Sequence, residues 1–208
     1  MAAVALVLYV TWALVAFGLR TLVQVRRTGD TGLRLGGGRP GSVEWFAKVL
    51  FVVALVLGVA APVAELAGWS TLVPALERSG IAWVGVVVTV VGILATVGAQ
   101  IRMGDSWRIG VDAAERTELV TGGPFSLVRN PIFTAMLVTT VGLVLMVPNV
   151  VALIGLLVLV VGLELQVRVV EEPYLRAAHG VVYVAYERRV GRFVPGLGRA
   201  RRTVTPSP

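Results

Sequence analysis

The sequence contains no cysteine, and this absence excludes several classes of site at once. Without thiols the chain can hold no disulfide, thiolate zinc site or iron–sulfur cluster, and it has no cysteine nucleophile. The single histidine, His179, argues against His-rich metal sites and histidine-dependent triads. We therefore predict no metal site.

Charged residues are scarce as well. They make up 15% of the 208 residues, whereas hydrophobic residues make up 56% and the mean hydropathy is +0.84. A soluble domain carries about a quarter charged residues. Because these apolar residues exceed what one soluble core could bury, the composition predicts an integral membrane protein and excludes disorder.

Long apolar runs divide the chain into candidate spans. A bilayer core about 30 Å thick needs roughly 20 apolar residues in a helix. Five runs qualify or nearly qualify: Ala2–Leu19, Trp45–Leu66, Ile81–Ile101, Ile132–Val147 and Val150–Val167. The last two are separated by Pro148–Asn149, which is a tight-turn signal and predicts a helical hairpin. We expect an all-α, polytopic membrane bundle of about five helices that forms a single domain over residues 1–208, with three spans in residues 1–101.

The basic residues indicate how these spans are oriented. Seventeen of the 19 positive charges lie between runs one and two, between runs three and four, or after run five, and Lys48 lies close to the first of these segments, near the start of run two. By the positive-inside rule these segments face the cytoplasm, so we expect the N-terminus outside and the C-terminus inside. The chain lacks the alternation of aromatic and basic residues that binds nucleic acid, so the expected partner is the lipid bilayer.

Polar residues collect after the third run and at the end of the fifth. Asn130-Pro131 predicts the start of a helix, whose backbone N–H groups serve either as an ordinary cap or as a site for an anionic group. Glu164, Arg168 and Glu171 are spaced by four and three residues and therefore share one helix face. They form either an interfacial ion pair or a polar pocket wall. Residues 174–195 predict an amphipathic interfacial helix.

Four segments in this order resemble the isoprenylcysteine carboxyl methyltransferase family of integral membrane enzymes. They read GDSWRIGVD from residue 104, ELVTGGPFSLVRNPIF from 118, RVVEEPYL from 168 and GVVYVAYERRVGRFVP from 180. The resemblance covers about half of the chain. It implies a methyltransferase whose cofactor, S-adenosylmethionine, occupies a cytoplasmic pocket built from residues 102–208.

The resemblance also implies roles for individual residues. Thr117, Glu118, Leu119 and Val120 would line the cofactor largely through backbone groups, and Phe125 would pack on it. Asn130, Pro131, Ile132 and Phe133 occupy a cofactor-binding motif in which the family has histidine at the first of these positions and tyrosine at the last. Glu171 would hold the polar end of the cofactor, and Arg168 would face the substrate.

The expected reaction is methyl transfer to a lipophilic or lipidated acceptor at a carboxylate, which is already ionised near neutral pH. Arg168 would orient this group. A phospholipid amine or a thiol is the alternative acceptor, and it needs a base such as Glu172 or Tyr183. A sterol-type reductase with a nicotinamide cofactor and a non-catalytic membrane protein are alternatives of other classes.

Overall fold

A computed structural model of the chain describes residues 1–33, 38–69, 73, 79–108 and 118–200. Every regular element in this part of the chain is a helix apart from isolated β-bridge residues, which confirms the all-α prediction. The N-terminal helix runs through α1 (Ala2–Ala13), the π-helical turn η1 (Leu14–Leu19) and α2 (Arg20–Thr28). It is followed by α3 (Val43–Leu66), α4 (Ser79–Met103), α5 (Pro131–Met146), α6 (Val150–Leu165), the π-helical turn η5 (Gln166–Glu171) and α7 (Glu172–Arg189).

Four of these helices are long and apolar enough to cross a membrane, namely those over Ala2–Thr28, Val43–Leu66, Ser79–Ser106 and Val150–Arg189. The helix Pro131–Met146 is a shorter apolar helix that lies among them. These five helices correspond to the five predicted runs. The chain is therefore a multi-pass membrane protein.

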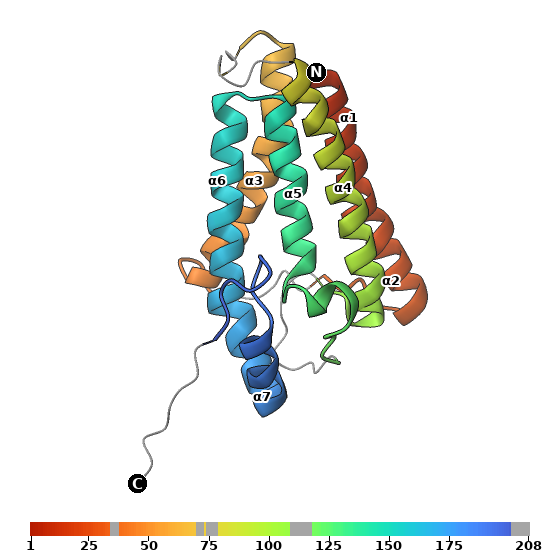
Figure 1. Cartoon of the computed structure of the whole chain (residues 1–208), viewed down its shortest axis with the longest axis vertical. Coiled ribbons are helices and arrows are strands. Elements are labelled where there is room, and N and C mark those ends of the chain that lie inside the picture. Colours follow the sequence, from red (N-terminus) through yellow and green to blue (C-terminus); the bar gives the residue numbers. More distant parts are fainter. Residues whose placement is uncertain (34–37, 70–72, 74–78, 109–117, 201–208) are drawn as a thin grey trace.

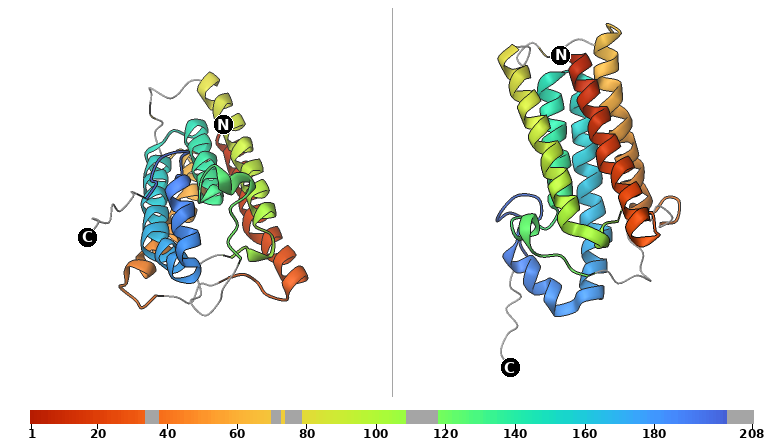
Figure 2. Two further views of the ribbon diagram at one scale, coloured as in Figure 1. Left: turned by 60° about the horizontal axis from the view of Figure 1, so that its bottom comes forward. Right: turned by 90° about the vertical axis from the view of Figure 1, so that its right-hand side faces the viewer.

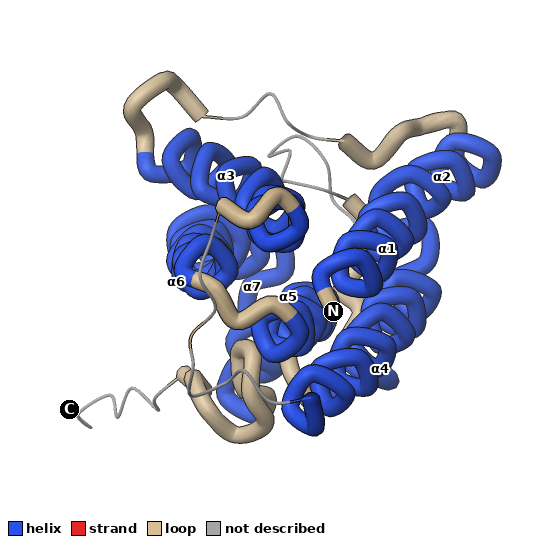
Figure 3. Tube along the Cα trace, turned by 90° about the horizontal axis from the view of Figure 1, so that it is seen from above, coloured by secondary structure: helices blue, strands red, loops and turns tan. Residues whose placement is uncertain are grey.

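The helices form one bundle with α5 at its centre. Seen from above, α3 lies beside α6 and α1 lies beside α4, with α5 between the two pairs (Figure 3). The N-terminus and the turn between α5 and α6 lie at one end of the bundle, and α7 lies at the other (Figure 1). At this second end α7 turns back beneath the bundle toward the start of α5 (Figure 2, right).

Small residues bring α4 and α5 into backbone contact. A Cβ atom at Gly92 would lie 2.6 Å from the backbone nitrogen of Thr139, and one at Gly142 would lie 2.5 Å from that of Thr89. Close approach of small residues is a common way to pack helices in lipid, where no hydrophobic effect drives helices together. The hydroxyls of Thr89 and Thr139 donate to carbonyls of their own helices, so this apolar interface contains no unsatisfied hydroxyl donor.

The predicted hairpin turn is confirmed and is anchored by Asn149. Its side-chain oxygen accepts from the backbone N–H of Ala152 at 2.9 Å and caps α6. Its side-chain nitrogen donates to the carbonyl of Ala61 on α3, also at 2.9 Å. This buried side chain thus joins the hairpin to α3.

Candidate active site

A cavity of about 680 Å³ lies at the end of the bundle that carries α7. Its walls come from the α1–α2 helix, α3, α4, the segment before α5, η5 and α7. Small-molecule sites usually have volumes of about 300–1,000 Å³. The two π-helical turns both contribute to it, since η1 supplies Phe17 and η5 supplies Gln166 and Glu171. Single π-turns inside α-helices occur frequently at functional sites.

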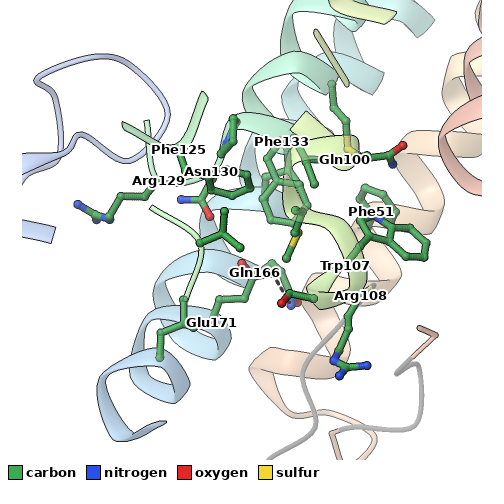
Figure 4. Close-up of a pocket in the computed structure, with 18 of the residues that line it drawn as sticks. Phe51, Gln100, Trp107, Arg108, Phe125, Arg129, Asn130, Phe133, Gln166 and Glu171 are labelled. Atoms are coloured by element: carbon green, nitrogen blue, oxygen red, sulfur yellow. Dashed lines mark hydrogen bonds between the residues drawn. The ribbon is translucent and has the colours of Figure 1, made fainter. Parts of the chain in front are cut away.

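The cavity collects nearly all the residues that the sequence assigned to the cofactor. Nine of them line it: Glu118, Leu119, Val120, Phe125, Asn130, Pro131, Ile132, Phe133 and Glu171. Thr117 lies outside the described residues. These side chains come from two segments of the chain that the fold brings to one cavity (Figure 4).

Asn130 and Pro131 stand at the start of α5, as the sequence predicted. The side-chain nitrogen of Asn130 donates to the carbonyl of Arg192 at 3.3 Å, and its backbone N–H donates to the same carbonyl at 3.1 Å. Asn130 therefore uses its donors to hold the C-terminal segment. The side chain makes no cap bond to the helix.

Glu171 ends the π-helical turn η5 and faces the cavity (Figure 4). The side-chain nitrogen of Gln166 donates to one of its carboxylate oxygens at 3.3 Å. Gln166 and Glu171 lie five residues apart, which is the repeat of a π-turn, so this local geometry presents both side chains to the same cavity. Glu171 is thus a carboxylate supported by a neutral amide.

The cavity fits the cofactor that the resemblance implies. S-adenosylmethionine carries positive charge on its sulfonium and its amino group, and Glu118 and Glu171 place two carboxylates on the wall. Aromatic rings of Phe125, Phe133 and Tyr183 also face the cavity, and such rings attract cations through their faces. The hydroxyl of Tyr186 donates to the carbonyl of Phe125 at 2.6 Å and so fixes this part of the wall.

Arg168, the predicted substrate-facing cation, does not line the cavity. Its side chain is 59% exposed and pairs with Glu164, one helical turn earlier. This is the interfacial ion pair that the sequence offered as one of two interpretations. The role of Arg168 toward a substrate stays a prediction, and its position gives that role no support.

Glu172 is also absent from the cavity wall, because it lies inside a buried ionic cluster. The cluster consists of Arg129, Glu172, Arg176, Glu187 and Arg192. Glu172 accepts from Arg129 at 2.6 Å and from Arg192 at 2.6 and 3.0 Å, and its side chain is 4% exposed. The hydrogen bond to this carboxylate raises the pKa of the Arg192 guanidinium. Arg176 also pairs with Glu172 at 3.4 Å, so three cations engage the carboxylate that the sequence considered as a base.

The cluster fixes the segment after α7 against the start of α5. Arg129 donates to the carbonyls of Glu187 at 3.0 Å, Val190 at 2.7 Å and Gly198 at 3.3 Å. A bridge also pairs Val128 with Gly191. The predicted helix over residues 174–195 is therefore shorter than expected: α7 ends at Arg189, with a non-helical break at Gly180, and a folded turn follows.

The sequence did not predict the contact between the N-terminal helix and the cavity wall at Trp107. Trp107 is 2% exposed, lines the cavity and stacks on Arg20, whose guanidinium carbon lies 4.8 Å from the ring centroid. Arg20 also donates to the carbonyl of Gly104. In the sequence Arg20 marks only the end of an apolar run. The one available signal was that this arginine and this tryptophan both flank predicted spans.

The described residues contain no group of three or more histidine, aspartate or glutamate side chains that could hold a metal ion. The polar groups of the cavity are instead carboxylates, amides and hydroxyls, together with the cationic side chains of Lys48, Arg108 and Arg129. This set is suited to binding an organic cation and to orienting an acceptor by hydrogen bonds.

Comparison with known proteins indicates the class of reaction. Residues 81–181, just under half of the chain, match the model of the phospholipid methyltransferase family. The chain is a membrane methyltransferase. The matched region is similar to the broad superfamily that includes the phospholipid and isoprenylcysteine carboxyl methyltransferases. No curated protein matches it.

The matched residues run from α4 into α7, so they include most of the cavity wall but none of α1, α2 or α3. The cofactor of this membrane methyltransferase is S-adenosylmethionine, as the sequence predicted. The match favours methyl transfer over the nicotinamide-dependent reduction that the sequence left open. It names phospholipids, whereas the sequence interpretation gave first place to a carboxylate acceptor.

Proposed function

We propose that this methyltransferase transfers a methyl group from S-adenosylmethionine to the amine of a membrane phospholipid. The observation that carries the proposal is the composition of this cavity. One side holds the predicted cofactor motif, with Asn130 and Glu171, and the other holds apolar side chains of the membrane-spanning segments η1 and α3, including Phe17 and Phe51. A lipid acceptor and a cationic cofactor can meet in such a space.

The cation that the sequence assigned to a carboxylate acceptor is not among those that line the cavity, which are Lys48, Arg108 and Arg129. A carboxylate acceptor was expected to be oriented by Arg168, but this side chain lies outside the cavity and pairs with Glu164. An amine acceptor needs no such cation. An amine acceptor also agrees with the match of residues 81–181 to the phospholipid methyltransferase family.

Residues of the C-terminal half would hold the cofactor. Glu171 would bind its amino group, backbone groups of Glu118–Val120 would line it, and Phe125 would pack on it. Bound S-adenosylmethionine supplies an electrophilic methyl group, so catalysis rests mainly on positioning the acceptor.

An amine acceptor arrives protonated and must lose a proton before it can act as a nucleophile. Glu118 is the second carboxylate of the cavity wall, and we assign it the task of accepting this proton. Glu172 is not suited to the task, because its carboxylate is engaged by Arg129 and Arg192.

The test uses the purified protein in lipid nanodiscs with methyl-labelled S-adenosylmethionine. We expect label in phosphatidylethanolamine and none in a prenylated cysteine acid, together with cofactor binding measured by calorimetry. Label only in the prenylated acid would overturn the amine proposal in favour of carboxyl methylation. Cofactor binding without label in either lipid would also overturn it.

We further propose that the cavity end of the bundle faces the cytoplasm. Both the clustered positive charge and the common end shared by α7 and the cavity support this orientation. Because the chain has no cysteine, single cysteines are clean probes. In intact cells an impermeant maleimide should label Ala67→Cys, next to the exposed Gly68, and should not label Ser126→Cys. The reverse pattern would contradict the orientation.

A further inference from the structure

The chain folds into a compact turn after α7, over residues 190–199, which we call the C-terminal turn. Its backbone closes on itself, because the N–H of Arg192 donates to the carbonyl of Leu197 at 2.8 Å and the N–H of Leu197 donates to that of Val194 at 3.0 Å. The ionic cluster around Glu172 fastens the turn to the start of α5. The turn is therefore held in one position on the bundle.

The C-terminal turn lies at the level of the apolar spans. Phe193 packs against a core cluster of α3 and α6 whose members on α6 are Leu159 and Leu163. Both precede Glu164, the first charged residue of α6. The hydroxyl of Thr134, one turn inside α5, donates to the carbonyl of Phe193 at 2.9 Å. In Figure 1 the dark blue turn rises beside the lower ends of α5 and α6, above α7. The turn thus reaches back from α7 to the depth at which the bundle enters the lipid.

Two apolar side chains of this turn point away from the protein. Val194 is 50% exposed and Leu197 is 65% exposed, whereas Phe193 beside them packs into the bundle. At the depth of the apolar spans these two side chains can enter the acyl region of a leaflet, and this removes their apolar surface from water. The tip of the turn is therefore suited to insertion into lipid.

Arginines surround this apolar tip. Between Arg188 and Arg199 the chain has four arginines and no acidic residue. Arg188 and Arg189 are exposed in the last turn of α7, directly before the C-terminal turn. Arg199 is exposed after it, and a Cβ atom at Gly196 would lie 3.7 Å from a guanidinium nitrogen of Arg199. Among the residues that the structure describes, none of these three exposed guanidinium groups forms an ion pair or a side-chain hydrogen bond.

We propose that the C-terminal turn is a binding surface for anionic phospholipid in the leaflet at the cavity end of the bundle. Val194 and Leu197 insert among the acyl chains, and the guanidinium groups of Arg188, Arg189 and Arg199 bind the headgroup phosphates. Apolar insertion combined with basic side chains is how protein segments attach to anionic membrane surfaces. Arginine suits this role, because its planar fork of donors matches a phosphate. The turn would then anchor the start of α5, and with it the cavity wall, to the membrane surface.

The depth of the turn can be measured with single cysteines, since the chain has none of its own. A fluorophore is attached at Leu197→Cys in protein reconstituted in nanodiscs that contain phosphatidylglycerol. The reference for lipid is Val87→Cys on α4, where the valine is 62% exposed, and the reference for water is Ala177→Cys, an exposed site on α7. We expect iodide, a quencher confined to water, to quench the label at residue 177 strongly and the labels at residues 197 and 87 weakly.

The headgroup preference is measured with the label at residue 197. We expect doxyl-labelled phosphatidylglycerol to quench it more strongly than doxyl-labelled phosphatidylcholine. Because each arginine near an anionic surface contributes about a fivefold change in binding, Arg199→Gln should lower this preference about fivefold. Changing Arg188, Arg189 and Arg199 together to glutamine should abolish it, and changing all three to lysine should keep it. The matched control is Arg26→Gln, at an exposed arginine in the last turn of α2.

Iodide quenching at residue 197 as strong as at residue 177 would show that the turn lies in water and would overturn the inference. A preference that survives the three glutamines, or that Arg26→Gln lowers equally, would overturn it as well. A wild-type melting temperature of the glutamine variant shows that its loss of preference does not come from unfolding. Neither measurement requires methyl transfer, so this inference and the proposed function can fail independently.

Discussion

The two halves of this molecule contribute different things to one cavity. The half from α4 onward contains the segments that resemble methyltransferases, the family match and the buried cluster around Glu172. The half formed by α1, α2 and α3 lies outside that match, yet it supplies the apolar wall and Lys48. On the proposed function, we therefore expect cofactor binding to depend on the second half and acceptor choice on the first.

The buried ionic cluster around Glu172 holds the second half of the chain together, and we expect the largest effect on stability there. Glu172→Ala should lower the free energy of unfolding by about 3–5 kcal/mol, because it leaves the guanidinium groups of Arg129 and Arg192 without their shared carboxylate. Thermal unfolding followed by tryptophan fluorescence in detergent measures the effect.

The control for this change is Glu164→Ala, which breaks the more exposed pair with Arg168 and should cost about 0–1 kcal/mol. If Glu172→Ala abolished turnover while leaving the melting temperature unchanged, Glu172 would act on the substrate as the sequence predicted, and the cluster would not be structural.

The contact between α4 and α5 should tolerate less change than the one between α3 and α6. A Cβ at Gly92 would lie 2.4 Å from the hydroxyl oxygen of Thr139, whereas one at Gly155 would lie 3.2 Å from the side chain of Leu57. Gly92→Ala should therefore destabilise the protein by about 1–3 kcal/mol. Gly155→Ala should lower the melting temperature less, and equal shifts would show that the two contacts are equally rigid.

Cofactor affinity should depend on the second half alone. Glu171→Gln removes the charge that faces the cavity and keeps the size of the side chain. We expect it to weaken S-adenosylmethionine binding about tenfold, or about 1.4 kcal/mol, in calorimetric titration. Glu164→Gln, outside the cavity, serves as the control. If Glu171→Gln bound S-adenosylmethionine with wild-type affinity, Glu171 would not contribute to cofactor binding.

The smallest effect is expected for Arg168→Ala. Because Arg168 is exposed and absent from the cavity wall, kcat/KM for the lipid acceptor should change by less than about twofold, or about 0.4 kcal/mol. Steady-state methylation assays decide the point. A tenfold or larger loss of kcat/KM would indicate that Arg168 contacts the substrate and would favour a carboxylate acceptor.

Much of the fold follows from local sequence. The lengths of the apolar runs predicted the five helices, Pro148–Asn149 predicted the hairpin turn, and Asn130-Pro131 predicted the start of α5. These features depend on hydrogen bonds within one helix or turn, because a backbone in lipid must satisfy its polar groups locally. The motif around Glu118–Phe133 also supplies much of the cavity wall, and its role in binding the cofactor stays a prediction.

The places where prediction and structure differ all depend on contacts between distant segments. Glu172 and Arg168 lie four residues apart, yet the first is buried between Arg129 and Arg192 and the second is exposed beside Glu164. Each has an ion-pair partner four residues away, so nothing local distinguishes them, and the shortest ion pairs of Glu172 are to Arg129 and Arg192, which lie 43 and 20 residues away. The stacking of Arg20 on Trp107 is equally non-local.

By itself the sequence determined that this chain is a multi-pass helical membrane protein with a methyltransferase motif in its second half, because run length, turn residues and motif order are local properties. Only the tertiary structure decided which charges face the cavity and that the N-terminal helix and α3 supply part of its wall. Those features arise where helices from separate parts of the chain pack together, and the packing of side chains between helices sets them.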